Sequence, residues 1–167
     1  MSNQNPKAAV IMGSDSDLPV VRKTIEVLKK FGIEYEVNIL SAHRTPDLTM
    51  EYARSAEQNG FEVIIAAAGK AAHLPGVIAA LSILPVIGIP IKSSTMDGLD
   101  SLLSIVQMPT GIPVATVAID GAENAGLLAV QILSVKHQQL KEKLKKHKED
   151  MQQAVIEKNN KVKEEVF

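Results

Sequence analysis

The segment Phe61-Glu62-Val63-Ile64-Ile65-Ala66-Ala67-Ala68 is apolar at every position except Glu62, and Gly69 follows it. A run of this kind predicts a β-strand that is covered on both faces at the centre of a sheet. A short helix is expected after it, ending near Leu81. Four other largely apolar runs predict further strands, at residues 7–12, 33–40, 85–90 and 114–119.

Helical patterns separate these strands. Asp17 and Pro19 mark the start of a first helix, and Gly32 ends it. Thr45 is expected to cap a second helix, with Pro46 in its first turn and its end near residue 60. Two more helices are predicted over residues 99–107 and 121–137.

Strand and helix alternate five times, which predicts an α/β fold. We expect a flavodoxin-like, doubly wound parallel sheet of order 2-1-3-4-5 with helices on both faces. Residues 1–137 would form a single α/β catalytic domain, and residues 138–167 a charged C-terminal extension that is helical or partly disordered. The helix over 121–137 is apolar on nearly every side at residues 125–130, which indicates packing against something besides its own sheet.

The composition excludes several function classes. The chain has no cysteine, which excludes disulfide scaffolds, thiol catalysis and cysteine-ligated metals. Aromatic residues make up 3%, too few for a stacking platform for single-stranded nucleic acid. The nine lysines of residues 134–167 are interleaved with six acidic residues, as in a solvated helix. No run suits a membrane span or a signal peptide, so we expect a cytoplasmic protein without nucleic-acid or membrane partners.

Three turns follow the first three strands and would lie side by side at one edge of the sheet. The first, residues 13–17, places the Ser14 and Ser16 hydroxyls and free backbone N–H groups at a helix start, where anions bind. It lacks both the Walker and the dinucleotide glycine patterns. The turn is therefore either a phosphate cradle or a simple capped turn.

The second and third turns each carry a histidine. In residues 41–46, His43 can transfer a proton near neutral pH, and Arg44 can bind a phosphate or carboxylate with its planar fork. In residues 69–76, His73 sits at the corresponding place, and Lys70 either faces a ligand or is solvated. No further ligand appears at metal spacing, so a metal site is not expected. The loop over 91–98 either folds over the pocket or covers the sheet edge.

From the residues alone, we expect an α/β protein that binds a small phosphorylated ligand beside an acid/base histidine. Four motifs go further, at residues 12–17, 41–46, 71–76 and 101–109. Together they resemble the PurE family, the N5-carboxyaminoimidazole ribonucleotide mutases of de novo purine synthesis. The resemblance implies an isomerase that moves a carboxylate from the exocyclic nitrogen to C4 of aminoimidazole ribonucleotide. It also implies that no cofactor or metal is used, and that eight copies assemble with sites at the subunit interfaces.

The resemblance assigns roles to individual residues. His43 matches the catalytic acid/base, and Arg44 with Ser16 and Ser41 would hold the 5′-phosphate. Asp17 would accept hydrogen bonds from the ribose. The remaining positions that match substrate-binding ones are Ser14, Gly69, His73 and Leu74.

Departures and alternatives stay open. The family usually has glycine where Ala67 and Lys70 stand here, and the lysine-rich extension matches no family motif. A related carboxylase, which adds CO2 directly to aminoimidazole ribonucleotide, is the nearest alternative. A flavodoxin-like module that binds a ligand without turnover is the second alternative.

Overall fold

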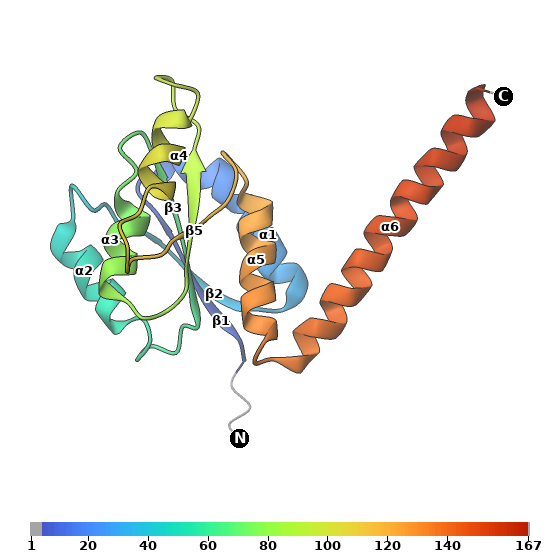
Figure 1. The fold of residues 1–167 in the computed structure, drawn as a ribbon. Coiled ribbons are helices and arrows are strands. Elements are labelled where there is room, and N and C mark those ends of the chain that lie inside the picture. The colour runs from blue at the N-terminus through green and yellow to red at the C-terminus, as the bar shows by residue number, and fades with distance from the viewer. Residues whose placement is uncertain (1–4, 167) are drawn as a thin grey trace.

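The computed structural model describes residues 5–166 and shows five parallel strands in the order β2-β1-β3-β4-β5 (Figure 1). This confirms the flavodoxin-like order. The strands are β1 (Lys7–Met12), β2 (Glu34–Ile39), β3 (Val63–Gly69), β4 (Val86–Ile91) and β5 (Ala115–Thr116). The helices are α1 (Leu18–Phe31), α2 (Pro46–Ser55), α3 (Leu74–Leu81), α4 (Leu99–Val106), α5 (Ala122–Ser134) and α6 (Gln138–Val166), and a 3-10 turn at Asp15–Asp17 precedes α1.

Helices cover both faces of the sheet, so successive residues of a strand enter different cores. In β1, Val10 packs in the core beneath α1 and α5, while Ala9 and Ile11 pack in the core beneath α2, α3 and α4. Both cores are formed by buried side chains, which explains why β1 from Ala8 onward, β3 and β4 read as unbroken apolar runs.

The fifth strand is much shorter than expected, because regular pairing is confined to Ala115–Thr116 rather than residues 114–119. The cause lies in its neighbour. The carbonyl of Pro90 in β4 accepts from the Asp120 N–H at 2.8 Å, but proline has no N–H to donate in return. The ladder therefore ends in single bonds, the last at Asp120, where φ is +54°.

Two helix ends also differ from the prediction. α2 stops at Ser55 rather than near residue 60, because residues 56–60 form tight turns that end at Gly60, with φ +81°.

α5 stops at Ser134 rather than at residue 137. Its apolar surface meets α1 closely, since a side-chain carbon at Gly126 would lie 2.8 Å from Cβ of Val27. Part of the packing that was predicted for α5 beyond its own sheet is thus its contact with α1 of the same chain.

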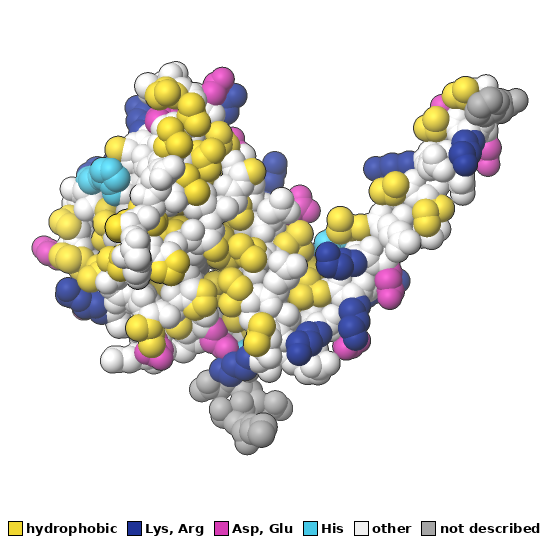
Figure 2. Space-filling model, in the orientation of Figure 1, with side chains coloured by type: hydrophobic (Ala, Val, Ile, Leu, Met, Phe, Trp, Pro, Cys, Tyr) yellow, Lys and Arg dark blue, Asp and Glu magenta, His cyan; other side chains and the backbone are white. Residues whose placement is uncertain are grey.

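α6 begins on the body and then projects away from it (Figure 1). Leu140 is 1% exposed, and the Lys143 ammonium donates to the Phe31 carbonyl at 2.6 Å. The apolar stripe of α6 repeats every eleven residues, at 140, 151 and 162 and at 144, 155 and 166. Its outer half is exposed, with Met151 at 55% (Figure 2). Within residues 5–166, no helix is both long and apolar enough to cross a membrane.

Candidate functional site

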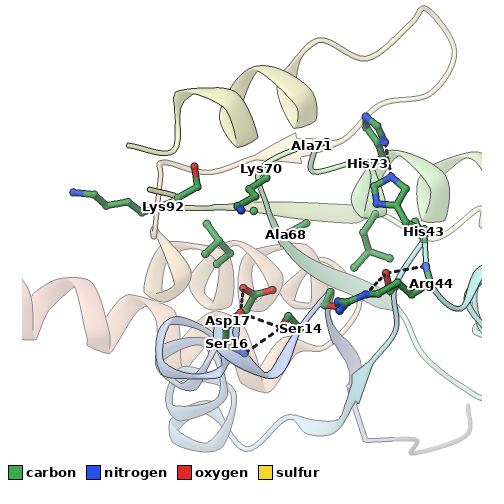
Figure 3. A pocket seen from close by; sticks show the side chains of 17 residues that line it. Ser14, Ser16, Asp17, His43, Arg44, Ala68, Lys70, Ala71, His73 and Lys92 are labelled. Carbon is green, nitrogen blue, oxygen red and sulfur yellow. Dashed lines mark hydrogen bonds between the residues drawn. The ribbon is translucent and has the colours of Figure 1, made fainter. Parts of the chain in front are cut away.

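A pocket of about 610 Å³ opens at the carboxyl ends of the strands. The turns after β1, β2 and β3 form its walls, and the end of β4 closes one side (Figure 3). This is where open α/β sheets bind ligands. All of the residues that the sequence nominated line it, namely Ser14, Ser16, Asp17, Ser41, His43, Arg44, Gly69, His73 and Leu74.

The turn after β1 forms a hydroxyl-rich floor. Ser14 Oγ accepts from the Ser16 N–H at 3.4 Å and from the Ser16 hydroxyl at 3.0 Å. The Gly13 N–H donates to the Ala67 carbonyl of β3 at 3.1 Å, which fixes the turn against the central strand. Two hydroxyls at the start of a 3-10 turn and helix suit an anionic ligand.

Asp17 is the N-cap residue of α1, which confirms the predicted start of this helix, but it is 6% exposed and its side chain makes no capping bond. Its carboxylate instead accepts from the Ser16 hydroxyl at 3.4 Å. Burial raises the pKa of Asp17 above its ordinary value, although hydrogen bonds from Ser14 and Ser16 and the charge of Arg44 act in the opposite direction. A partly dehydrated carboxylate is a strong acceptor for hydroxyl donors of a ligand.

Arg44 joins the first two turns. Its Nη2 donates to the Gly13 carbonyl at 2.7 Å, and its Nε donates to Ser41 Oγ at 3.4 Å. Thr45 is the N-cap residue of α2, as expected, and its carbonyl accepts from the Thr49 N–H at 3.0 Å, but its side chain makes no capping bond. The Thr45 hydroxyl instead donates to the Ser41 carbonyl at 3.1 Å and accepts from the Ser41 N–H at 2.9 Å, which closes the turn that carries His43 and Arg44.

The two histidines meet across the pocket. His43 Nε2 and His73 Nδ1 lie 2.8 Å apart, and their rings pack edge to face at 4.9 Å. One of these nitrogens carries the hydrogen that both share. The bond links the turn after β2 to the turn after β3, and it places two proton carriers at one end of the pocket. Among the described residues, no group of three or more acidic or histidine side chains is spaced to hold a metal ion.

The turn after β3 is tight. The Ala72 N–H donates to the Lys70 carbonyl, and the His73 N–H donates to the Ala71 carbonyl, both at 2.8 Å. Lys70 adopts φ +55°, a conformation that favours glycine. Its side chain lines the pocket.

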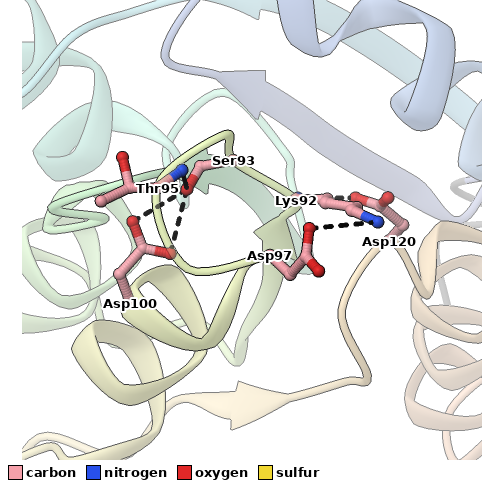
Figure 4. A network of polar contacts seen from close by, with 6 residues as sticks. All are labelled: Lys92, Ser93, Thr95, Asp97, Asp100 and Asp120. Atoms are coloured by element: carbon pink, nitrogen blue, oxygen red, sulfur yellow. Dashed lines mark hydrogen bonds and ion pairs between the residues drawn. The ribbon is translucent and has the colours of Figure 1, made fainter.

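Lys92 and Ser93 also line the pocket. They begin the 91–98 loop, which the sequence placed either over the pocket or at the sheet edge without assigning a binding role to either residue. Asp120 accepts from the Lys92 N–H at 2.8 Å, and the Lys92 ammonium pairs with Asp97 at 3.3 Å (Figure 4). The Ser93 hydroxyl donates to Asp100 at 2.9 Å. The base of the 91–98 loop therefore borders the pocket.

Comparison with known proteins agrees with this geometry. A family model described as AIR carboxylase matches residues 7–154. The chain is 58% identical to the N5-carboxyaminoimidazole ribonucleotide mutase of Pyrococcus horikoshii, over 98% of this chain and 93% of that protein. It is 56% identical to the chloroplastic phosphoribosylaminoimidazole carboxylase of Vigna aconitifolia, over 91% of this chain but 27% of that protein. Among solved structures, Treponema denticola PurE superposes with a TM-score of 0.86 at 31% identity, covering 94% of this chain and 98% of that one.

Proposed function

The chain belongs to the AIR carboxylase family, and we propose that it is an isomerase of purine biosynthesis acting on N5-carboxyaminoimidazole ribonucleotide. The reaction moves the carboxylate from the exocyclic nitrogen to C4, giving 4-carboxy-5-aminoimidazole ribonucleotide. One observation carries the proposal: a single pocket joins a floor of serine hydroxyls and Arg44 to a hydrogen-bonded pair of histidines. A phosphorylated ligand that exchanges a proton during reaction needs both.

The substrate is proposed to lie across the three turns. Its 5′-phosphate binds Arg44, Ser16 and Ser41, because a planar guanidinium and hydroxyl donors match phosphate oxygens. Its ribose hydroxyls donate to Asp17. The aminoimidazole ring and the carboxylate then lie against Gly69, His73 and Leu74, with Ser14 completing the floor.

In the proposed mechanism, His43 acts first as an acid and then as a base. The bond between the exocyclic nitrogen and the carboxylate carbon breaks, CO2 leaves, and the nitrogen takes a proton from His43. C4 then attacks the CO2 held in the pocket, and His43 removes the C4 proton. The proton returns to its donor, so the cycle needs no other reactant. Closure against water retains the CO2 between the two steps.

Replacement of His43 by Asn tests this mechanism. The variant should fold, but kcat should fall by about three orders of magnitude or more, within the range that general acid–base catalysis supplies together with positioning. Conversion of N5-carboxyaminoimidazole ribonucleotide is followed by absorbance, and folding by circular dichroism. His147→Asn is the matched control, because His147 lies on α6 beside Phe31 and should leave kcat unchanged. Activity retained in His43→Asn would refute the acid/base role.

The carboxylase alternative has support from the Vigna aconitifolia relative. We favour the mutase, since the chain spans nearly the full length of the Pyrococcus horikoshii relative. Each substrate is supplied separately to the wild-type protein. Rapid turnover of aminoimidazole ribonucleotide with CO2, and none of the N5-carboxylated compound, would establish the carboxylase instead. Binding without turnover of either would leave a ligand-binding module.

We further propose that the chain assembles as a homo-octamer. Exposed apolar side chains support this assembly: Leu99, Leu103 and Val106 follow one face of α4, and Val155 and Val162 extend the stripe of α6 (Figure 2). Sedimentation should give a mass eight times the 18.0 kDa of one chain. Val155→Lys with Val162→Lys should yield smaller species, because charge would replace the apolar stripe. A wild-type protein that sediments as a single chain would refute the octamer.

A further inference from the structure

Lys70 has a backbone conformation that its side chain does not explain. Among residues 5–166, three residues other than glycine have positive φ, and the other two are Asp97 and Asp120, whose short carboxylates bond to neighbouring groups at Lys92. A lysine gains no such local bond, because its ammonium lies at the end of a four-carbon chain. Within residues 5–166, the Lys70 ammonium makes no hydrogen bond or ion pair. The strained position is thus occupied without a compensating contact inside the chain.

The other cations of the pocket are already engaged. Arg44 donates to the Gly13 carbonyl at 2.7 Å, and Lys92 pairs with Asp97 at 3.3 Å. Lys70 reaches into the pocket from the turn after β3 (Figure 3). It therefore offers a positive charge to a ligand without first having to leave a protein partner.

The turn also fixes the backbone from which this charge projects. Two tight hydrogen bonds hold the backbone from Lys70 to His73 at 2.8 Å each. Lys70 thus enters the pocket from the turn after β3, whereas Arg44 enters from the turn after β2 and the serine floor from the turn after β1. A ligand with two anionic groups could therefore meet two cations that come from different turns.

We propose that Lys70 binds the carboxylate of the substrate and product, and so separates carboxylated from uncarboxylated ribonucleotides. This inference rests on the proposed function. The carboxylate is charged before and after transfer but neutral as CO2 in between. A fixed ammonium stabilises the two end states and not the intermediate, so it lowers KM without raising kcat.

Two ligands that differ in one group test the proposal. Calorimetry measures the binding of 4-carboxy-5-aminoimidazole ribonucleotide and of aminoimidazole ribonucleotide, which has the phosphate but no carboxylate. The variants are Lys70→Gly, which suits the positive φ, Lys70→Met, which keeps the stem and removes the charge, and Lys70→Arg, which keeps the charge. The Gly and Met variants should each lower the affinity for the carboxylated ligand about tenfold, within the range of a partly exposed charge-assisted hydrogen bond. Both variants should bind the uncarboxylated ligand with an affinity within about twofold of wild type. The Arg variant should keep its affinity for both ligands.

The outcomes separate cleanly. An equal loss of affinity for both ligands would overturn the proposal, since Lys70 would then bind the phosphate or only raise the positive potential of the whole pocket. Loss in the Gly variant alone would overturn it too, because the turn and not the charge would matter. Unchanged binding in every variant would show a solvated lysine. If the wild-type protein binds neither ribonucleotide, the proposed function itself fails; if it binds both and the variants match it, only the role of Lys70 fails.

Discussion

The two ends of the sheet are built in opposite ways. At the carboxyl end, the pocket holds a nearly buried carboxylate at Asp17 and a left-handed backbone at Lys70. At the amino end, Leu140 is 1% exposed, and Glu62 accepts from both His137 at 2.8 Å and Lys136 at 3.0 Å. One end keeps unfavourable conformations and dehydrated charge where a ligand binds. The other end supplies apolar burial and paired charge that offset them.

The largest effect is expected at the amino end. Leu140→Ala should lower the free energy of unfolding by about 2–5 kcal/mol, because it leaves a cavity beneath α6. Urea denaturation measures the change, and KM should stay the same. Met151→Ala, on the same stripe but 55% exposed, is the control and should cost less than about 0.5 kcal/mol in a dissociated chain. Equal losses would mean that the two halves of α6 are equivalent.

Arg44→Lys, at the carboxyl end, should have a smaller effect, and it should change KM rather than stability. KM should rise about tenfold, or about 1.4 kcal/mol, because a point charge replaces a planar fork. Unfolding should change little, since the turn is also held by Thr45. Steady-state kinetics with the N5-carboxylated substrate measure KM, and Arg54→Lys, an exposed residue of α2, is the control. An unchanged KM would remove Arg44 from the binding site.

The smallest effect is expected for Asp17→Asn, and it should be a gain in stability. Burial raises the folded-state pKa of Asp17, so the folded protein binds the proton more tightly than the unfolded chain. Wild-type stability therefore falls as pH rises from 3.8 through the raised pKa. The Asn variant should be slightly more stable at pH 7, and the advantage should shrink as the pH is lowered toward 3.8. Denaturation at several pH values measures this, and a variant less stable than wild type at pH 7 would contradict it.

Much of this architecture was predictable because it depends on local patterns. The unbroken run at 63–68 identified the central strand, and the turn residues after it placed the pocket. Failures came where tertiary contacts overrode local preference. Pro90 shortened β5 because it could not donate across the ladder, and the Thr45 hydroxyl bonded back to Ser41 rather than to the first turn of α2.

The parts of the pocket that the sequence left open have the same explanation. Lys92 follows a strand like many solvated lysines, and only the folded arrangement of the turns shows that it borders the pocket. The 2.8 Å contact between His43 and His73 joins residues thirty positions apart. Sequence could place both at the same edge of the sheet, but the meeting of their rings depends on how tightly the turn from Lys70 to His73 is wound.

The outer part of α6 gives the molecule a lever. Leu140, Lys143 and His147 hold the base of the helix on the body. At 1.5 Å per residue, the part of α6 over residues 148–166 forms a rod about 28 Å long, and a rotation of about 10° at its base would move the tip by about 5 Å. Small repacking around Phe31 would thus be amplified at a distance, and the side chains near residue 31 set the direction in which the far end of the helix points.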